Sequence, residues 1–219
     1  MIIRSVIFDL DGTLLETTYE IHYIFNELLS LNDLPIRSRQ FYKENIGNGI
    51  EHLLSRCLPE KFSGDHSLLL LQAKELYAAN LNKRSFVFDG ILDVLDKLSK
   101  KKVKVGIVTN KMHHLAVRCV DLFFNEYDIQ IIGADHIYPR KPKPDSALSL
   151  AKVFGHLPSE MLFVGDSSVD MKTAKNARMR SAGVLWGNGT QNELEDCGAD
   201  MIFANTSDLE AFVSTICTH

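Results

Sequence analysis

The sequence lacks the features that mark exported, membrane-spanning and disulfide-rich proteins. Among its 219 residues, no apolar run approaches the ~20 residues that a membrane span needs. The apolar run before Asp9 is also too short for a signal peptide. The four cysteines, Cys57, Cys119, Cys197 and Cys217, are far apart and form no CxxC pair, so we expect neither disulfides nor a cysteine metal site. These absences predict a cytoplasmic protein with no membrane partner.

An excess of positive charge is missing as well. The chain has 24 Lys and Arg against 28 Asp and Glu, for a formal net charge of −4. A nucleic-acid-binding protein usually shows a basic stripe, so we expect no nucleic-acid partner. At 45% hydrophobic and 24% charged residues, the composition is that of a globular protein and not of a disordered chain.

Short β-branched runs alternate with helical patterns along most of the chain. This alternation is typical of an α/β fold with a doubly wound parallel sheet that helices cover on both faces. The predicted strands are residues 2–8, 103–108, 129–132, 161–164, 184–186 and 201–203. We expect helices to be capped by Asp89, by Asp145, and by Ser207 with Glu210 in a capping box.

Residues 14–85 break this alternation because they contain no convincing strand. Apolar residues recur there at helical spacing in three stretches, within residues 21–29, 50–54 and 69–76. A connection between strand and helix normally takes about 2–6 residues. We therefore predict an inserted all-helical cap domain at 14–85 over an α/β core domain at 1–13 and 86–219.

Polar residues follow the predicted strands, where an open parallel sheet binds its ligand. In chain order they are Asp9, Asp11, Thr109, Asn110, Lys143 in a proline-rich loop, Asp166 and Asp170. Each aspartate alone would be an ordinary turn residue, but turn chemistry does not explain their shared place at strand ends.

The acidic residues in this set predict a metal ion. Four carboxylates in one crevice would repel a phosphate monoester, which itself carries roughly −1.5 to −2 charges. Lys143 supplies one positive charge, and Mg²⁺ would supply two in the all-oxygen shell that it prefers. Mg²⁺ is therefore the cofactor that we expect if the substrate is a small phosphorylated metabolite.

Four segments of the sequence, DLDGTLLET, VTN, KPKPD and GDSSVD, resemble the four ordered motifs of the haloacid dehalogenase superfamily of phosphatases. The resemblance implies a Rossmann-like core with a helical cap. It also implies that Asp9 is the nucleophile that forms an aspartyl-phosphate, and that Asp11 is the general acid and base.

The same resemblance assigns the remaining residues to the metal and the phosphate. It implies that Mg²⁺ is held by Asp9, the backbone carbonyl of Asp11, and Asp166. Asp170 would support them through water or Lys143. The phosphate oxygens would be bound by Thr109, Asn110 and Lys143.

The substrate class follows from Asp11 and the cap. Dehalogenases and phosphonate hydrolases of the superfamily replace the second aspartate, so its presence here points to phosphate monoesters. The cap segment of phosphoglycolate phosphatases resembles Gly47, Asn48 and Gly49 of this sequence, so 2-phosphoglycolate is the first substrate to consider. An ordinary interhelical turn would explain these three residues as well. A second glycine pair, Gly187 and Gly189, is expected in a loop that either stays apart from the crevice or borders it.

Two residues depart from the family pattern. Glu16 stands where many relatives have Asp, and Arg178 stands where they have a helix-ending glycine. Because a left-handed cap at Arg178 would be strained, we expect this helix to close differently.

Three other activities remain open. A phosphomutase of the β-phosphoglucomutase kind or a pyrophosphatase would use the same core. A phospho-acceptor regulatory domain would share the α/β plan and an acidic metal site, but not the long cap.

Overall fold

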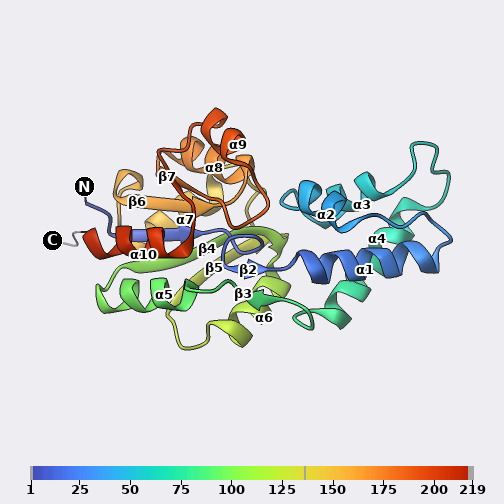
Figure 1. Cartoon of the computed structure of the whole chain (residues 1–219), viewed down its shortest axis with the longest axis horizontal. Helices are drawn as coiled ribbons and strands as arrows, with labels where there is room; N and C mark the ends of the chain where they lie inside the picture. Colours follow the sequence, from blue (N-terminus) through green and yellow to red (C-terminus); the bar gives the residue numbers. More distant parts are fainter. Residues whose placement is uncertain (1, 136, 217–219) are drawn as a thin grey trace.

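The computed structural model describes residues 2–135 and 137–216 and contains a six-stranded parallel sheet with the order β5-β4-β1-β6-β7-β8 (Figure 1). Each neighbouring pair of strands in it is parallel. The strands are β1 (Ser5–Phe8), β4 (Lys104–Met112), β5 (Ile129–Ala134), β6 (Met161–Gly165), β7 (Arg180–Val184) and β8 (Met201–Phe203). The predicted doubly wound α/β fold is therefore confirmed.

Helices cover both faces of the sheet because alternate strand residues point to opposite faces. Val6 and Phe8 belong to one apolar cluster, and Ile7 belongs to the other. The first cluster includes residues from α5 (Ile91–Lys100), α6 (His113–Phe123) and α10 (Thr206–Thr215). The second includes residues from α7 (Asp145–Phe154) and α8 (Ser168–Ala177). A short 3-10 turn (Pro158–Glu160) and α9 (Gln191–Asp196) complete this part of the chain.

Four helices, which we call the cap helices, lie together beyond one end of the sheet (Figure 1). They are α1 (Thr18–Leu31), α2 (Arg39–Asn45), α3 (Ile50–Cys57) and α4 (His66–Asn80). All four fall within the predicted cap domain, residues 14–85. The two connections to the sheet pair with each other as antiparallel strands, β2 (Leu15–Glu16) and β3 (Phe86–Val87). The prediction that 14–85 contains no strand missed β2, which is too short to show a pattern.

The predicted strand at 184–186 is wrong. The strand is β7 (Arg180–Val184), which pairs with β6 on one side and β8 on the other. Its residues Ser181, Ala182 and Gly183 are small and have little β propensity, so tertiary pairing and not composition makes this segment a strand. β4 is also longer than predicted, because Thr109 and Asn110 lie inside it, at a register shift, and not after its end.

Several helix ends differ from the sequence predictions. The N-cap of α5 is Gly90 and not Asp89, and Asp145 is the first residue of α7 and not its cap. Asn205 caps α10 by accepting from the backbone N–H of Asp208, so the predicted box at Ser207 does not form. Of the three N-cap residues, only Asn205 has the extended backbone typical of a cap, and Gly90 is left-handed.

Arg178 also corrects an expectation. It ends α8 in the left-handed conformation, with φ of 57° and ψ of 32°. The backbone N–H of Arg178 bonds to Lys175, and that of Met179 bonds to Ala174. These two bonds close the helix in the usual glycine-type geometry, so the chain accepts the strain of a side chain there.

The structure also bears on the expected lack of membrane spans and of disulfides. Within residues 2–135 and 137–216, no helix is long and apolar enough to cross a membrane. Cys57, Cys119 and Cys197 are free thiols, whereas Cys217 lies outside the described residues.

Candidate active site

Two aspartates lie side by side because they follow adjacent strands. Asp9 comes directly after β1, and Asp166 comes directly after β6. The backbone N–H of Asp9 donates to the carbonyl of Val164 at 2.9 Å, which extends the ladder by one residue. Parallel strands end at the same edge of the sheet, so both carboxylates are brought to one place.

Asp170 completes a cluster of three buried carboxylates. Ligand atoms of Asp9, Asp166 and Asp170 all lie within 4.8 Å of one another. Asp170 stands in the first turn of α8, where its Oδ2 accepts from the backbone N–H and the hydroxyl of Ser167. Such a set of hard oxygen ligands, close together and shielded from solvent, fits a divalent cation such as Mg²⁺.

The electrostatics of the cluster also fit a cation. Burial raises the pKa of Asp9 to about 8, against the opposing charge of Lys141, and the carboxylates of Asp170 and Asp166 add to the rise. Burial, followed by the charge of Asp170, raises the pKa of Asp166 to about 7. The protein alone therefore does not balance these charges near neutral pH, and a divalent cation would.

The lysine that reaches this cluster is Lys141, not the predicted Lys143. The Nζ of Lys141 lies 2.6 Å from Oδ1 of Asp9 and 2.7 Å from Oδ1 of Asp170, and its side chain is 3% exposed. Burial alone would lower the pKa of this ammonium group, but Asp170 and Asp9 raise it. Lys143 is exposed, because it lies two residues further along a loop that has already turned away. Asp170 is therefore supported by Lys141.

Loop residues pack closely against Asp166 from the other side. Its Oδ2 accepts from the backbone N–H of Asn188 at 2.7 Å, and its Oδ1 accepts from the hydroxyl of Thr13 at 3.2 Å. A Cβ on Gly12 would collide with the Asp166 carboxylate, and one on Gly187 would meet the carbonyl of Gly12. The segment from Gly187 to Gly189 is thus a loop that borders the crevice.

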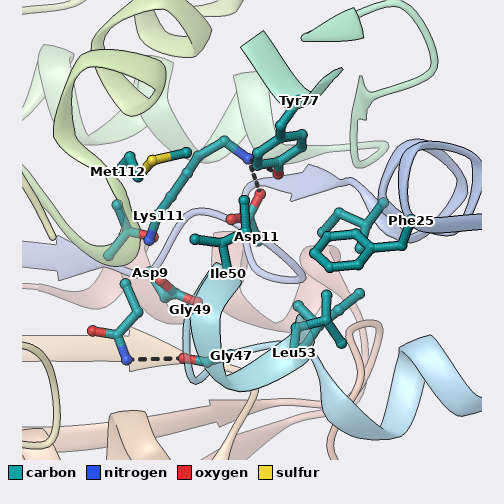
Figure 2. A pocket seen from close by; sticks show the side chains of 14 residues that line it. Asp9, Asp11, Phe25, Gly47, Gly49, Ile50, Leu53, Tyr77, Lys111 and Met112 are labelled. Atoms are coloured by element: carbon teal, nitrogen blue, oxygen red, sulfur yellow. Dashed lines mark hydrogen bonds and ion pairs between the residues drawn. The ribbon is translucent and has the colours of Figure 1, made fainter. Parts of the chain in front are cut away.

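Asp11 has a separate partner. Its Oδ1 lies 2.8 Å from Nζ of Lys111, which also donates to the hydroxyl of Tyr77 at 2.6 Å (Figure 2). Tyr77 comes from α4, so this chain of contacts joins the sheet to the cap helices. Neither Lys111 nor Tyr77 was predicted as a site residue from the sequence. A lysine inside a buried strand requires an acidic partner, but the predicted strand 103–108 ends before Lys111, so this signal was lost.

Thr109 and Asn110 are buried and line the same cavity as Asp9, although they lie within β4 and not after its end. The hydroxyl of Thr109 accepts from the backbone N–H of Lys111 at 3.1 Å. The side-chain amide of Asn110 donates to the carbonyls of Gly47, at 2.9 Å, and Lys141, at 3.2 Å. Both amide hydrogens of Asn110 are therefore engaged in joining the cap segment to the loop of Lys141.

The glycine segment of the cap lies at the site, but not all of it lines the cavity. Gly47 and Gly49 line it and have φ of 116° and 89°, a conformation that favours glycine (Figure 2). A Cβ on Gly49 would also come within 2.8 Å of Nη1 of Arg140. The Asn48 side chain is exposed and is not among the lining residues, so the prediction that it contacts substrate is not supported.

The cavity enclosed between the sheet and the cap helices has a volume of about 50 Å³. A cavity of about 10–15 Å³ holds one water molecule, so this one admits a small group. Asp9, Asp11, Thr109 and Asn110 form one end. The rest of the wall is largely apolar, and Phe25, Ile50 and Leu53 project into it in Figure 2.

The comparison with known proteins agrees with this geometry. The profile of the haloacid dehalogenase-like hydrolase family matches residues 6–184. The chain belongs to this family. The match begins in β1 and ends at the last residue of β7, so it spans the strands that carry Asp9, Thr109 and Asp166 as well as the whole cap.

Individual relatives of this hydrolase cover nearly its whole length. It is 27% identical over 217 residues to a phosphoglycolate phosphatase of Nitrosococcus oceani, covering 96% of each chain. It is 28% identical over 229 residues to a phosphoglycolate phosphatase of Escherichia coli K12, covering 94% of this chain and 91% of the other. A crystal structure from Lactobacillus delbrueckii superposes with a TM-score of 0.87 at 25% identity, covering 97% and 99% of the two chains.

Proposed function

We propose that this hydrolase is a Mg²⁺-dependent phosphatase that cleaves a small phosphate monoester through an aspartyl-phosphate on Asp9. The observation that carries the proposal is the arrangement of two aspartates in one cavity, each with its own lysine. Asp9 is paired with Lys141 and Asp11 is paired with Lys111. Two carboxylates in different surroundings suit two different roles, one as nucleophile and one as proton carrier.

Mg²⁺ would be held by Asp9, Asp166, Asp170 and the backbone carbonyl of Asp11. When bound, it would supply the positive charge that lets a phosphate dianion approach the carboxylates. Lys141 adds a further charge beside Asp9. Thr109 and Asn110 line the same cavity, and in this proposal both bind the phosphate oxygens, Thr109 through its hydroxyl. Positioned charges of this kind supply most of the catalysis in phosphoryl transfer.

The reaction takes two steps. An Oδ of Asp9 attacks phosphorus, the bond from phosphorus to the ester oxygen breaks, and Asp11 gives a proton to the departing alkoxide. In the second step, Asp11 removes a proton from water, and the resulting hydroxide displaces Asp9 from phosphorus. Inorganic phosphate leaves, and both aspartates return to their starting states. Closure of the cap over the cavity would exclude bulk water from the first step.

We take 2-phosphoglycolate as the first substrate to test, because the cavity is small and the relatives reported above are phosphoglycolate phosphatases. The free thiols Cys57, Cys119 and Cys197 support a reducing, cytoplasmic setting.

The deciding experiment compares wild type with Asp9→Asn in a panel of phosphorylated small acids, sugars and nucleotides, with and without Mg²⁺. We expect Asp9→Asn to abolish Mg²⁺-dependent phosphate release. The control Asp121→Asn changes an exposed aspartate at the end of α6 and should leave it intact. Full turnover by Asp9→Asn would refute the proposal.

The products separate the remaining alternatives. A phosphomutase returns an isomerised sugar phosphate, and a pyrophosphatase acts on pyrophosphate and not on monoesters. A phospho-acceptor domain would hold its aspartyl-phosphate for minutes with Mg²⁺ present. Free phosphate released from a monoester, with rapid loss of the label from Asp9, supports the phosphatase.

A further inference from the structure

Besides the residues proposed to bind the phosphate, the cavity offers an anion little apart from Lys111 and Tyr77. The apolar side chains that line it are Ile21, Phe25, Ile46, Ile50, Leu53 and Met112. Among the described residues that line the cavity, Lys111 carries the one cationic side chain. An anionic group on the substrate would lose its hydration there with no compensation unless it met this ammonium group.

Lys111 has the capacity for one more partner. Its Nζ donates to Asp11 at 2.8 Å and to Tyr77 at 2.6 Å, and its side chain is 1% exposed. An ammonium group has three N–H donors, so these two contacts leave one.

We propose that Lys111 binds the carboxylate of the leaving group, so that this hydrolase selects phosphate monoesters that carry a carboxylate one carbon from the ester oxygen. The proposal rests on the proposed phosphatase function. Asp11 must deliver its proton to the ester oxygen, and in such a substrate the carboxylate is joined to that oxygen through a single carbon. A cation in contact with Asp11 therefore lies where the carboxylate must be.

The same molecule already contains an ammonium group that bridges two carboxylates. Lys141 lies 2.6 Å from Asp9 and 2.7 Å from Asp170, both buried. Lys111 would do the same between Asp11 and the substrate. This arrangement offsets the repulsion between the two anions and satisfies the third donor.

Tyr77 is the positioning residue in this arrangement. Its hydroxyl, carried on α4 of the cap, fixes Nζ of Lys111 at the boundary between sheet and cap. Removing the hydroxyl leaves the charge in place but frees it to move. Tyr77→Phe should therefore weaken recognition of the carboxylate less than loss of the charge does.

The experiment measures kcat/KM for 2-phosphoglycolate and for 2-hydroxyethyl phosphate, which has a hydroxymethyl group in place of the carboxylate. The readout is the ratio of the two values in wild type, Lys111→Met and Tyr77→Phe. Both substrates release an alkoxide, so any loss of Asp11 orientation lowers both values and cancels in the ratio. We expect the ratio to fall about 10- to 100-fold in Lys111→Met. In Tyr77→Phe we expect a fall of about 3- to 10-fold.

Two controls report on the rest of the molecule. Lys152→Met removes an exposed lysine from α7 and should leave the ratio unchanged. Inhibition by inorganic phosphate reads the Asp9 end of the site, so it should be retained in Lys111→Met if that variant is folded. Should Lys111→Met fail to fold, Tyr77→Phe carries the test, and an unchanged ratio in it overturns the proposal.

The remaining outcomes are distinct. Equal losses on both substrates in Lys111→Met mean that Lys111 only supports Asp11, and the carboxylate assignment is wrong. A wild-type enzyme that hydrolyses monoesters with Mg²⁺ but shows no preference for the carboxylate also overturns it, while leaving the phosphatase function standing. A wild-type enzyme inert to every monoester, including p-nitrophenyl phosphate, overturns both.

Discussion

Replacing Lys141 by Met should destabilise the protein far more than the same replacement at Lys143, two residues away in the same loop. The Lys141 ammonium lies within 2.7 Å of two buried carboxylates, whereas Lys143 is exposed. Removing one member of a buried ionic group leaves an uncompensated charge, at a cost of about 3–5 kcal/mol. An exposed substitution such as Lys143→Met should change the free energy of unfolding by less than about 0.5 kcal/mol.

Urea unfolding measures this difference. With an m-value of about 2–3 kcal/mol/M, the midpoint for Lys141→Met should fall by roughly 1–2 M, and that for Lys143→Met should stay in place. Activity should fall about 10²- to 10³-fold in Lys141→Met, since this lysine contacts Asp9, the proposed nucleophile, and should be retained in Lys143→Met. Equal effects of the two substitutions would refute the reasoning.

Three further outcomes follow from the structure. With divalent cations removed, the melting temperature should fall as pH rises from about 5 to 8, because folded Asp9 and Asp166 keep protons that the unfolded chain has released. Each carboxyl group changes the free energy of unfolding by at most about 1.4 kcal/mol per pH unit. Mg²⁺ should reverse most of the fall, and a flat profile would contradict the raised pKa values. Arg178→Gly should raise the free energy of unfolding, measured by urea unfolding, by about 1 kcal/mol, because it removes a side chain from a residue in the left-handed conformation. A decrease would mean that the contacts of the Arg178 side chain stabilise the protein more than its backbone strain destabilises it. Gly12→Ala should abolish phosphatase activity, because the new Cβ would collide with Asp166. The control is Gly155→Ala, which also lies at positive φ but has open space around it. Activity assays of this control should show little change.

The sheet and its acidic edge could be predicted because both follow from local pattern. A short apolar run identifies fully buried strands such as β1 and β6, and a polar residue directly after such a strand must lie at the edge of the sheet. Asp9 and Asp166 satisfy that rule without any knowledge of the loops. β7 could not be identified in this way, because a strand of small residues has no apolar run to detect.

The choice between Lys141 and Lys143 could not be made from the sequence. Both lie in the segment KPKP, and no periodicity fixes which way a loop side chain points. Lys141 is buried because Asp9 and Asp170 pull one ammonium group into the crevice, and these partners are 132 and 29 residues away. The contact between Tyr77 and Lys111 is equally inaccessible, since it depends on how the cap helices pack over the sheet.

The two lysines divide the site into a part that the sheet builds alone and a part that the cap completes. The contacts of Lys141 with Asp9 and Asp170 all come from segments around the sheet, so a displaced cap would leave them intact. The contact of Lys111 with Tyr77 joins the sheet to α4 and would break on the same displacement. For the proposed reaction, phosphate binding would therefore depend on the sheet, whereas control of the leaving group would depend on closure of the cap. Changes in the cap would then alter which ester is accepted without altering how phosphorus is attacked.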